Sequence, residues 1–165
     1  VELINRHLSK LLRNQLNMFE HFFDKDLFLH LSGDITKEDV IKTMYEKAHD
    51  KGIVDERFID SVLQREEIGD TNMNEVFALP HPMELCATDT KVVVALLDTP
   101  IKWNESNSIQ IVFMLVIKQG EMQDFEHLYD IFIEIINDNK LEQKIIDSRT
   151  YDEFINVLYD GISIE

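Results

Sequence analysis

Two long, largely apolar runs most constrain what this chain can fold into. They cover 91–97 and 109–117 and are rich in β-branched residues. The longest uninterrupted stretch, Ile111–Ile117, is far shorter than the ~20 residues that span a bilayer,. Runs of this size are typical of central strands buried on both faces. A sheet of such strands needs helices on each side, so the chain is expected to alternate between the two.

Apolar residues at helical spacing predict those helices. Thr36–Asp39 is typical of a capping box that opens a helix to about His49, closed by Gly52,. Other helices are expected over 3–23, 55–67, 124–137, 141–147 and 151–159, and short strands over 27–31 and 76–79. The order predicts an α/β fold, a mixed β-sheet sandwiched by helices, with an N-terminal helical extension.

The 165 residues suit one domain, which we place at 24–165, preceded by a linker or docking helix at 1–23,. Because the sequence begins at Val1 and not at Met, we interpret it as part of a longer protein. Leu8, Leu11 and Leu12 of the first helix would contact a partner helix or pack on the parent protein.

Charge and cysteine content exclude several classes of function. The net charge of −16 argues against direct contact with nucleic acid, which needs clustered Lys and Arg,. Residues 121–165 hold twelve acidic and three basic side chains, which indicates a solvated face or a basic partner,. A single cysteine, Cys86, fits a reducing compartment, and no signal peptide or spanning segment is seen, so we expect a cytoplasmic protein without membrane insertion,.

We expect neither metal nor cofactor. Four of the six histidines and Cys86 share no metal-ligand spacing, and no glycine-rich phosphate loop is present,. Those histidines are His7, His21, His30 and His49.

One short motif carries candidate chemistry. The apolar segment Phe77–Leu79 runs into Pro80, His81 and Pro82, and Arg65 stands sixteen residues before the histidine. Neutral imidazole can act as a nucleophile towards phosphorus, and a guanidinium matches the oxygens of a phosphoryl group. By position alone, a histidine after proline is more often a structural residue than a nucleophile.

Arg65–Glu66 followed at this distance by a small-apolar-Pro-His motif resembles the IIA (EIIA) domains of the mannitol/fructose class of the bacterial sugar phosphotransferase system (PTS). The resemblance implies that His81 is phosphorylated and that Arg65 neutralises the phosphoryl charge. It also implies that His127 orients or stabilises the phosphoryl group, unless it is a surface residue without a role. Glu75 would bond the imidazole or fix Arg65, or simply be solvated. Thr71 could donate a hydrogen bond to the phosphoryl group.

Two further sequence matches indicate a subgroup of these EIIA domains. His81–Pro82 and the later Pro100–Ile101–Lys102–Trp103 resemble the EIIA-like domains at the C-terminus of BglG/LicR/MtlR-type transcriptional antiterminators and activators. This resemblance implies a sugar-flux-sensing regulatory domain whose partners are the phosphocarrier HPr, an EIIB domain and the other domains of the same regulator. It would be a phosphohistidine phosphotransferase component and not an enzyme that turns over alone.

Two alternatives stay open: the EIIA component of a sugar transporter, and an interaction module that is not phosphorylated. The chain also differs from many family members, which have glycines before the motif strand. Here the segment reads Asn72–Met73–Asn74, and since asparagine tolerates positive φ we expect the turn to persist,.

Overall fold

The computed structural model describes residues 1–162, and the side chains of residues 11–19, 122 and 124 lie outside that description. Its helices are α1 (Glu2–Phe22), α2 (Lys37–Asp50), α3 (Glu56–Ile68), α4 (Met122–Ile136), α5 (Asn139–Ile146) and α6 (Tyr151–Gly161), with a short 3-10 turn at Lys25–Leu27. Its strands are β1 (Phe28–Leu31), β2 (Phe77–Ala78), β3 (Lys91–Lys102) and β4 (Ser108–Val116).

The four strands form one mixed sheet in the order β1-β3-β4-β2. β3 and β4 are its antiparallel centre, with Val94 opposite Phe113. β1 pairs with β3 and β2 pairs with β4, both in parallel. The two apolar runs are therefore the central strands, as predicted.

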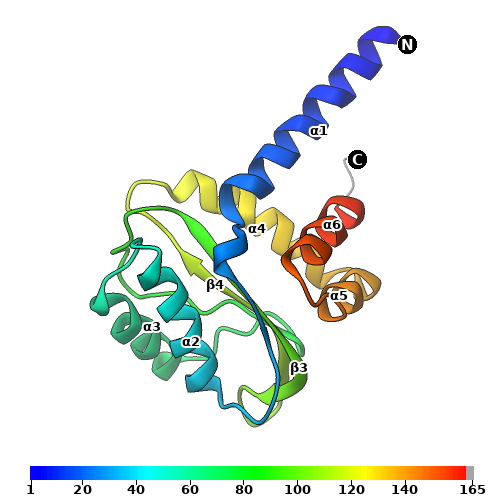
Figure 1. The fold of residues 1–165 in the computed structure, drawn as a ribbon. Helices are drawn as coiled ribbons and strands as arrows, with labels where there is room; N and C mark the ends of the chain where they lie inside the picture. The colour runs from blue at the N-terminus through cyan, green and yellow to red at the C-terminus, as the bar shows by residue number, and fades with distance from the viewer. Residues whose placement is uncertain (163–165) are drawn as a thin grey trace.

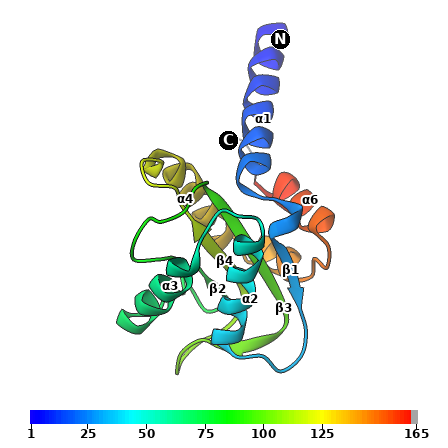
Figure 2. The same ribbon diagram turned by 60° about the vertical axis from the view of Figure 1, so that its left-hand side comes forward.

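Helices cover both faces of this sheet (Figures 1 and 2). Alternate residues of the strands point to opposite faces. Val92, Val94 and Leu96 pack in one core with α4, α5 and α6. Val93, Ala95 and Leu97 pack in a second core with α2 and α3. The predicted α/β sandwich is confirmed.

Local signals in the sequence determine several element ends. Thr36 and Asp39 form the capping box that starts α2, and Gly52 follows this helix with a φ of +77°. α1 is the predicted N-terminal extension and projects away from the sheet (Figure 1). At the end of this helix Phe22 and the following Phe23 are buried in the core.

Two strands differ from prediction in length. β3 continues through the polar Asp98–Pro100, because a bulge between Leu96 and Ile101 lets the hairpin resume pairing at Ile101 opposite Ile109,. β2 is shorter than expected, with only two residues in regular ladder pairing. Among the described residues, no helix is long and apolar enough to cross a membrane.

Candidate functional site

A cleft of about 430 Å³ opens where β2 and β4 end. Its walls come from the end of α3, the loop after it, the segment after β2, the end of β4 and the start of α4. The lining residues are Arg65, Asp70, Thr71, Asn72, Met73, Leu79, His81, Leu85, Leu115, Ile117, Phe125 and Tyr129. The site therefore combines three residues predicted from sequence, His81, Arg65 and Thr71, within a mainly apolar wall.

The imidazole of His81 is held in one tautomer. Its Nδ1 lies 2.9 Å from the carbonyl oxygen of Leu79. A carbonyl oxygen can only accept, so Nδ1 carries the proton and donates it. The lone pair then resides on Nε2, which is the atom available as a nucleophile.

Backbone bonds on both sides of His81 fix its segment. Leu115 of β4 donates its N–H to the carbonyl of Pro80 at 2.9 Å, so the chain follows β4 beyond the two residues of β2. After the histidine, the backbone N–H groups of Met83 and Glu84 donate to the buried hydroxyl of Ser61 on α3, at 2.9 and 3.1 Å. Ser61 was not predicted from the sequence. The one feature that could have indicated it is the position of a serine on the apolar side of α3.

Arg65 is half-buried in the last turn of α3. One guanidinium nitrogen donates to the carbonyl of Gly69 at 2.7 Å, which caps the helix,. A guanidinium has five N–H donors, so most of them stay available to an anion in the cleft. The cap and the predicted phosphoryl contact are therefore compatible.

Two other predicted residues, His127 and Glu75, do not line the cleft. His127 is exposed on α4 between Phe125 and Tyr129, and those two residues, not His127, line the cleft. Glu75 is exposed and is not a lining residue. Thr71 does line the cleft, but its hydroxyl donates to Glu66. The roles of His127 and Glu75 stay predictions.

The glycine-free turn before β2 persists by a different route from the one expected. No described residue other than glycine has a positive φ. Instead, the Asn74 carboxamide oxygen accepts from the backbone N–H groups of Val76 and Phe77, both at 2.9 Å. Side-chain hydrogen bonds thus replace backbone freedom.

Asn74 also reaches a buried acid. Its amide nitrogen donates to Glu142 on α5 at 2.7 Å. Glu142 is 6% exposed, and burial raises the pKa of its carboxyl above the ordinary value. The bond from Asn74 opposes that shift but does not cancel it. This contact connects the motif turn to α5, 68 residues later in the chain, and has no local sequence signal.

The fold and the cleft together define a class: an α/β sandwich that presents one histidine with a free Nε2 beside an arginine. Residues 21–161 match the family model for the phosphoenolpyruvate-dependent sugar phosphotransferase system, EIIA 2. The chain therefore belongs to this EIIA family.

Individual relatives fall into two groups. Over 150 residues, 91% of the chain, it is 27% identical to a protein described as "Probable licABCH operon regulator" from Bacillus subtilis, of which it spans only 23%. It is 25% identical to the mannitol-specific phosphotransferase enzyme IIA component of the same organism, covering 74% of the chain and 85% of the relative.

A solved structure shares the fold. The complex of enzyme IIAMTL and phosphorylated enzyme IIBMTL from Escherichia coli contains a chain that matches with a TM-score of 0.72 at 17% identity, covering 84% of this chain and 97% of that one.

Proposed function

We propose that this chain is a phosphocarrier domain that accepts a phosphoryl group on Nε2 of His81 from phospho-HPr. The observation that carries the proposal is the bond from Nδ1–H to the Leu79 carbonyl, which leaves Nε2 unprotonated on a histidine that lines the cleft. Family membership supports a role in phosphoryl transfer.

The transfer needs one bond made and one broken. The Nε2 lone pair attacks phosphorus, and the bond from phosphorus to the donor's imidazole nitrogen breaks with its electron pair returning to the donor. The positive charge on the new phosphoimidazole is stabilised by the Leu79 carbonyl at Nδ1–H. Arg65 would face the phosphoryl oxygens and offset their charge during transfer.

We place this domain in a transcriptional antiterminator or activator, where phosphorylation of His81 reports sugar flux. The match to the licABCH regulator supports this context because it extends over 91% of the chain. Residues 1–23 would then connect the domain at 24–165 to preceding domains. These domains, and not this one, would contact nucleic acid.

The transporter reading remains the second candidate. It is favoured by the match to the mannitol enzyme IIA component and by the likeness to an enzyme IIA chain seen with its phosphorylated enzyme IIB. In that case His81 passes its phosphoryl group to a cysteine of an EIIB domain.

The test is labelling with Enzyme I, HPr and radiolabelled phosphoenolpyruvate. We expect acid-labile label on the wild type, none on His81→Ala, and slower labelling of His127→Ala. Label that survives in His81→Ala would move the site elsewhere. An unlabelled wild type, beside a labelled known IIA, would leave only the interaction module.

A chase with the purified EIIB domain of a sugar transporter tests the second candidate. Rapid transfer of the label to the cysteine of that EIIB domain supports the transporter component. Label that stays on His81 in its presence contradicts the transporter component.

A further inference from the structure

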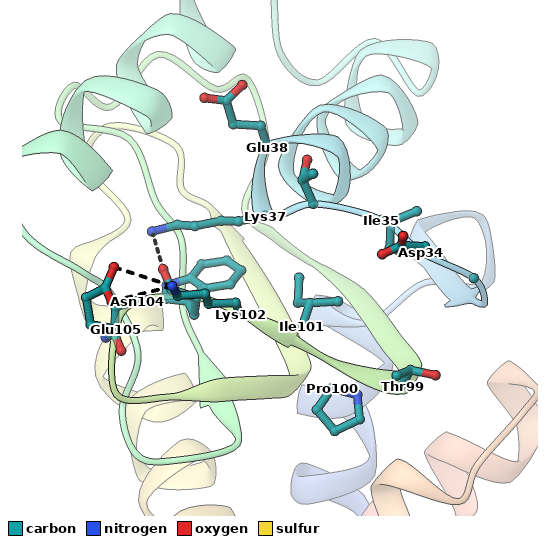
Figure 3. Close-up of a pocket in the computed structure, with 13 residues that line it drawn as sticks. Asp34, Ile35, Lys37, Glu38, Thr99, Pro100, Ile101, Lys102, Asn104 and Glu105 are labelled. Atoms are coloured by element: carbon teal, nitrogen blue, oxygen red, sulfur yellow. Dashed lines mark hydrogen bonds and ion pairs between the residues drawn. The ribbon is translucent and has the colours of Figure 1, made fainter.

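Lys37 does not line the cleft, but it contacts side-chain or backbone groups of three other residues. It stands in the first turn of α2 and lines a separate open pocket of about 910 Å³ (Figure 3). Its Nζ lies 2.7 Å from a carboxylate oxygen of Glu66 and 3.3 Å from one of Asp70. It also lies 4.6 Å from the centroid of the Trp103 ring, and the dashed line from Lys37 in Figure 3 marks its 3.5 Å bond to the Trp103 carbonyl.

Glu66 connects this cluster to the cleft. Its side chain is only 6% exposed, so its charge depends on Lys37 for compensation,. The second carboxylate oxygen of Glu66 accepts a hydrogen bond from the Thr71 hydroxyl. Because removal of one partner from a buried ion pair is costly, the pair holds Glu66, and through it Thr71, in a single position.

Thr71 in turn is bonded to the motif. Its carbonyl accepts the backbone N–H of Leu79 at 2.9 Å. The carbonyl of Leu79 accepts Nδ1–H of His81, also at 2.9 Å. One ion pair and three hydrogen bonds therefore connect Lys37, through Glu66, Thr71 and Leu79, to the imidazole of His81.

We propose that Lys37, Glu66 and Thr71 are positioning residues that keep the Leu79 carbonyl aimed at Nδ1 and so hold His81 in the tautomer with a free Nε2. None of the three needs to touch the phosphoryl group. The effect on transfer rests on the proposed function, whereas the effect on the tautomer does not.

Two readouts distinguish this role from simple stabilisation of the fold. The first is the tautomer of unphosphorylated His81, read from the ring ¹⁵N chemical shifts by NMR. The second is the rate of transfer from phospho-HPr, separated into its value at saturating phospho-HPr and the half-saturating concentration.

The variants test the path from both ends. Thr71→Val removes only the hydroxyl, Thr71→Ser restores it, and Lys37→Met removes the cation. Lys102→Met is the matched control, because this exposed lysine of the same pocket pairs only with Glu105 in the described interactions. If Thr71→Val does not fold, Lys37→Met gives the same two readouts from a partly exposed position.

We expect Thr71→Val and Lys37→Met to mix the two His81 tautomers and to lower the saturating transfer rate about tenfold, with less than about a twofold change in the half-saturating concentration. Thr71→Ser and Lys102→Met should resemble the wild type. Wild-type ¹⁵N shifts in folded Thr71→Val or Lys37→Met would overturn the proposal, and so would a loss confined to the half-saturating concentration. A wild type that is never labelled refutes the proposed function, while its tautomer measurement still tests the path.

Discussion

At the scale of residues, hydrogen bonds of backbone carbonyls and amides position the candidate nucleophile. The Leu79 carbonyl selects the His81 tautomer, and Pro80 and the Ser61 hydroxyl hold the segment on either side. The identities of His81 and Arg65 could be predicted from the sequence because their spacing is a family motif. Ser61 and Glu66 could not be assigned roles, since their partners are fixed only by how α3 packs against the motif segment.

Glu142 gives a pH-dependent prediction at this scale. Burial raises the pKa of its carboxyl above 4.5 in the folded protein, so between 4.5 and the raised value the folded state binds more protons than the unfolded state,. This contribution to stability is therefore present below pH 4.5 and lost as pH rises through the raised pKa. We expect Glu142→Gln, which retains an oxygen for Asn74, to gain stability relative to the wild type as pH rises from 4 to 7.

Urea unfolding at several pH values measures this difference, with the exposed Glu126→Gln on α4 as the control. A stability difference between wild type and Glu142→Gln that is the same at every pH would contradict the assignment.

At the scale of elements, helix starts follow local rules and strand lengths do not. The Thr36 capping box and the Gly52 stop were readable because both depend on a few neighbouring residues. The lengths of β2 and β3 differ from prediction, since strand ends depend on the partner strand: β3 regains register with β4 after a bulge. The contact of α6 with the chain after α1 is equally invisible in local sequence, because Tyr151 bonds the carbonyl of Phe23.

Tyr151 yields a prediction about how α6 is attached. Its hydroxyl donates to the Phe23 carbonyl at 3.2 Å, and burial raises the pKa of the phenol to about 12. We expect Tyr151→Phe to lower the free energy of unfolding by about 1 kcal/mol, the net value of one such bond. Chemical denaturation measures it, and spectrophotometric titration of the wild type should show a tyrosine ionising near pH 12.

Tyr129→Phe, which alters an exposed tyrosine, is the control and should leave stability unchanged. Equal stability of Tyr151→Phe and Tyr129→Phe would show that the bond to Phe23 contributes nothing.

At the scale of the whole molecule, the start of the N-terminal helix is exposed, whereas the residue just after this helix is buried in the sandwich. Residues 1–10 are exposed, whereas Phe23 is buried against Phe113 and Phe154. The core therefore includes Phe22, the last residue of α1, and Phe23, and the domain start at residue 24 stays a prediction.

Truncation tests that division. Deleting residues 1–10 should change the free energy of unfolding by less than about 0.5 kcal/mol, as for surface changes. Phe23→Ala should cost about 3–5 kcal/mol, because it opens a cavity between the sheet and α6. Thermal and urea unfolding compare the two. A large loss of stability on deletion of 1–10 would mean that α1 is integral to the domain.

The amino-acid sequence is enough to predict the class of fold and to identify the family motif that contains Arg65 and His81. Apolar runs and helical stripes depend on burial, which is a property of each segment, and the spacing of Arg65 and His81 is fixed along the chain. The packed structure was needed to find which nitrogen of His81 is free, which residues form the cleft wall, and that Lys37 connects to the motif. Those outcomes depend on hydrogen bonds between segments far apart in sequence, whose geometry exists only once the helices have packed on the sheet.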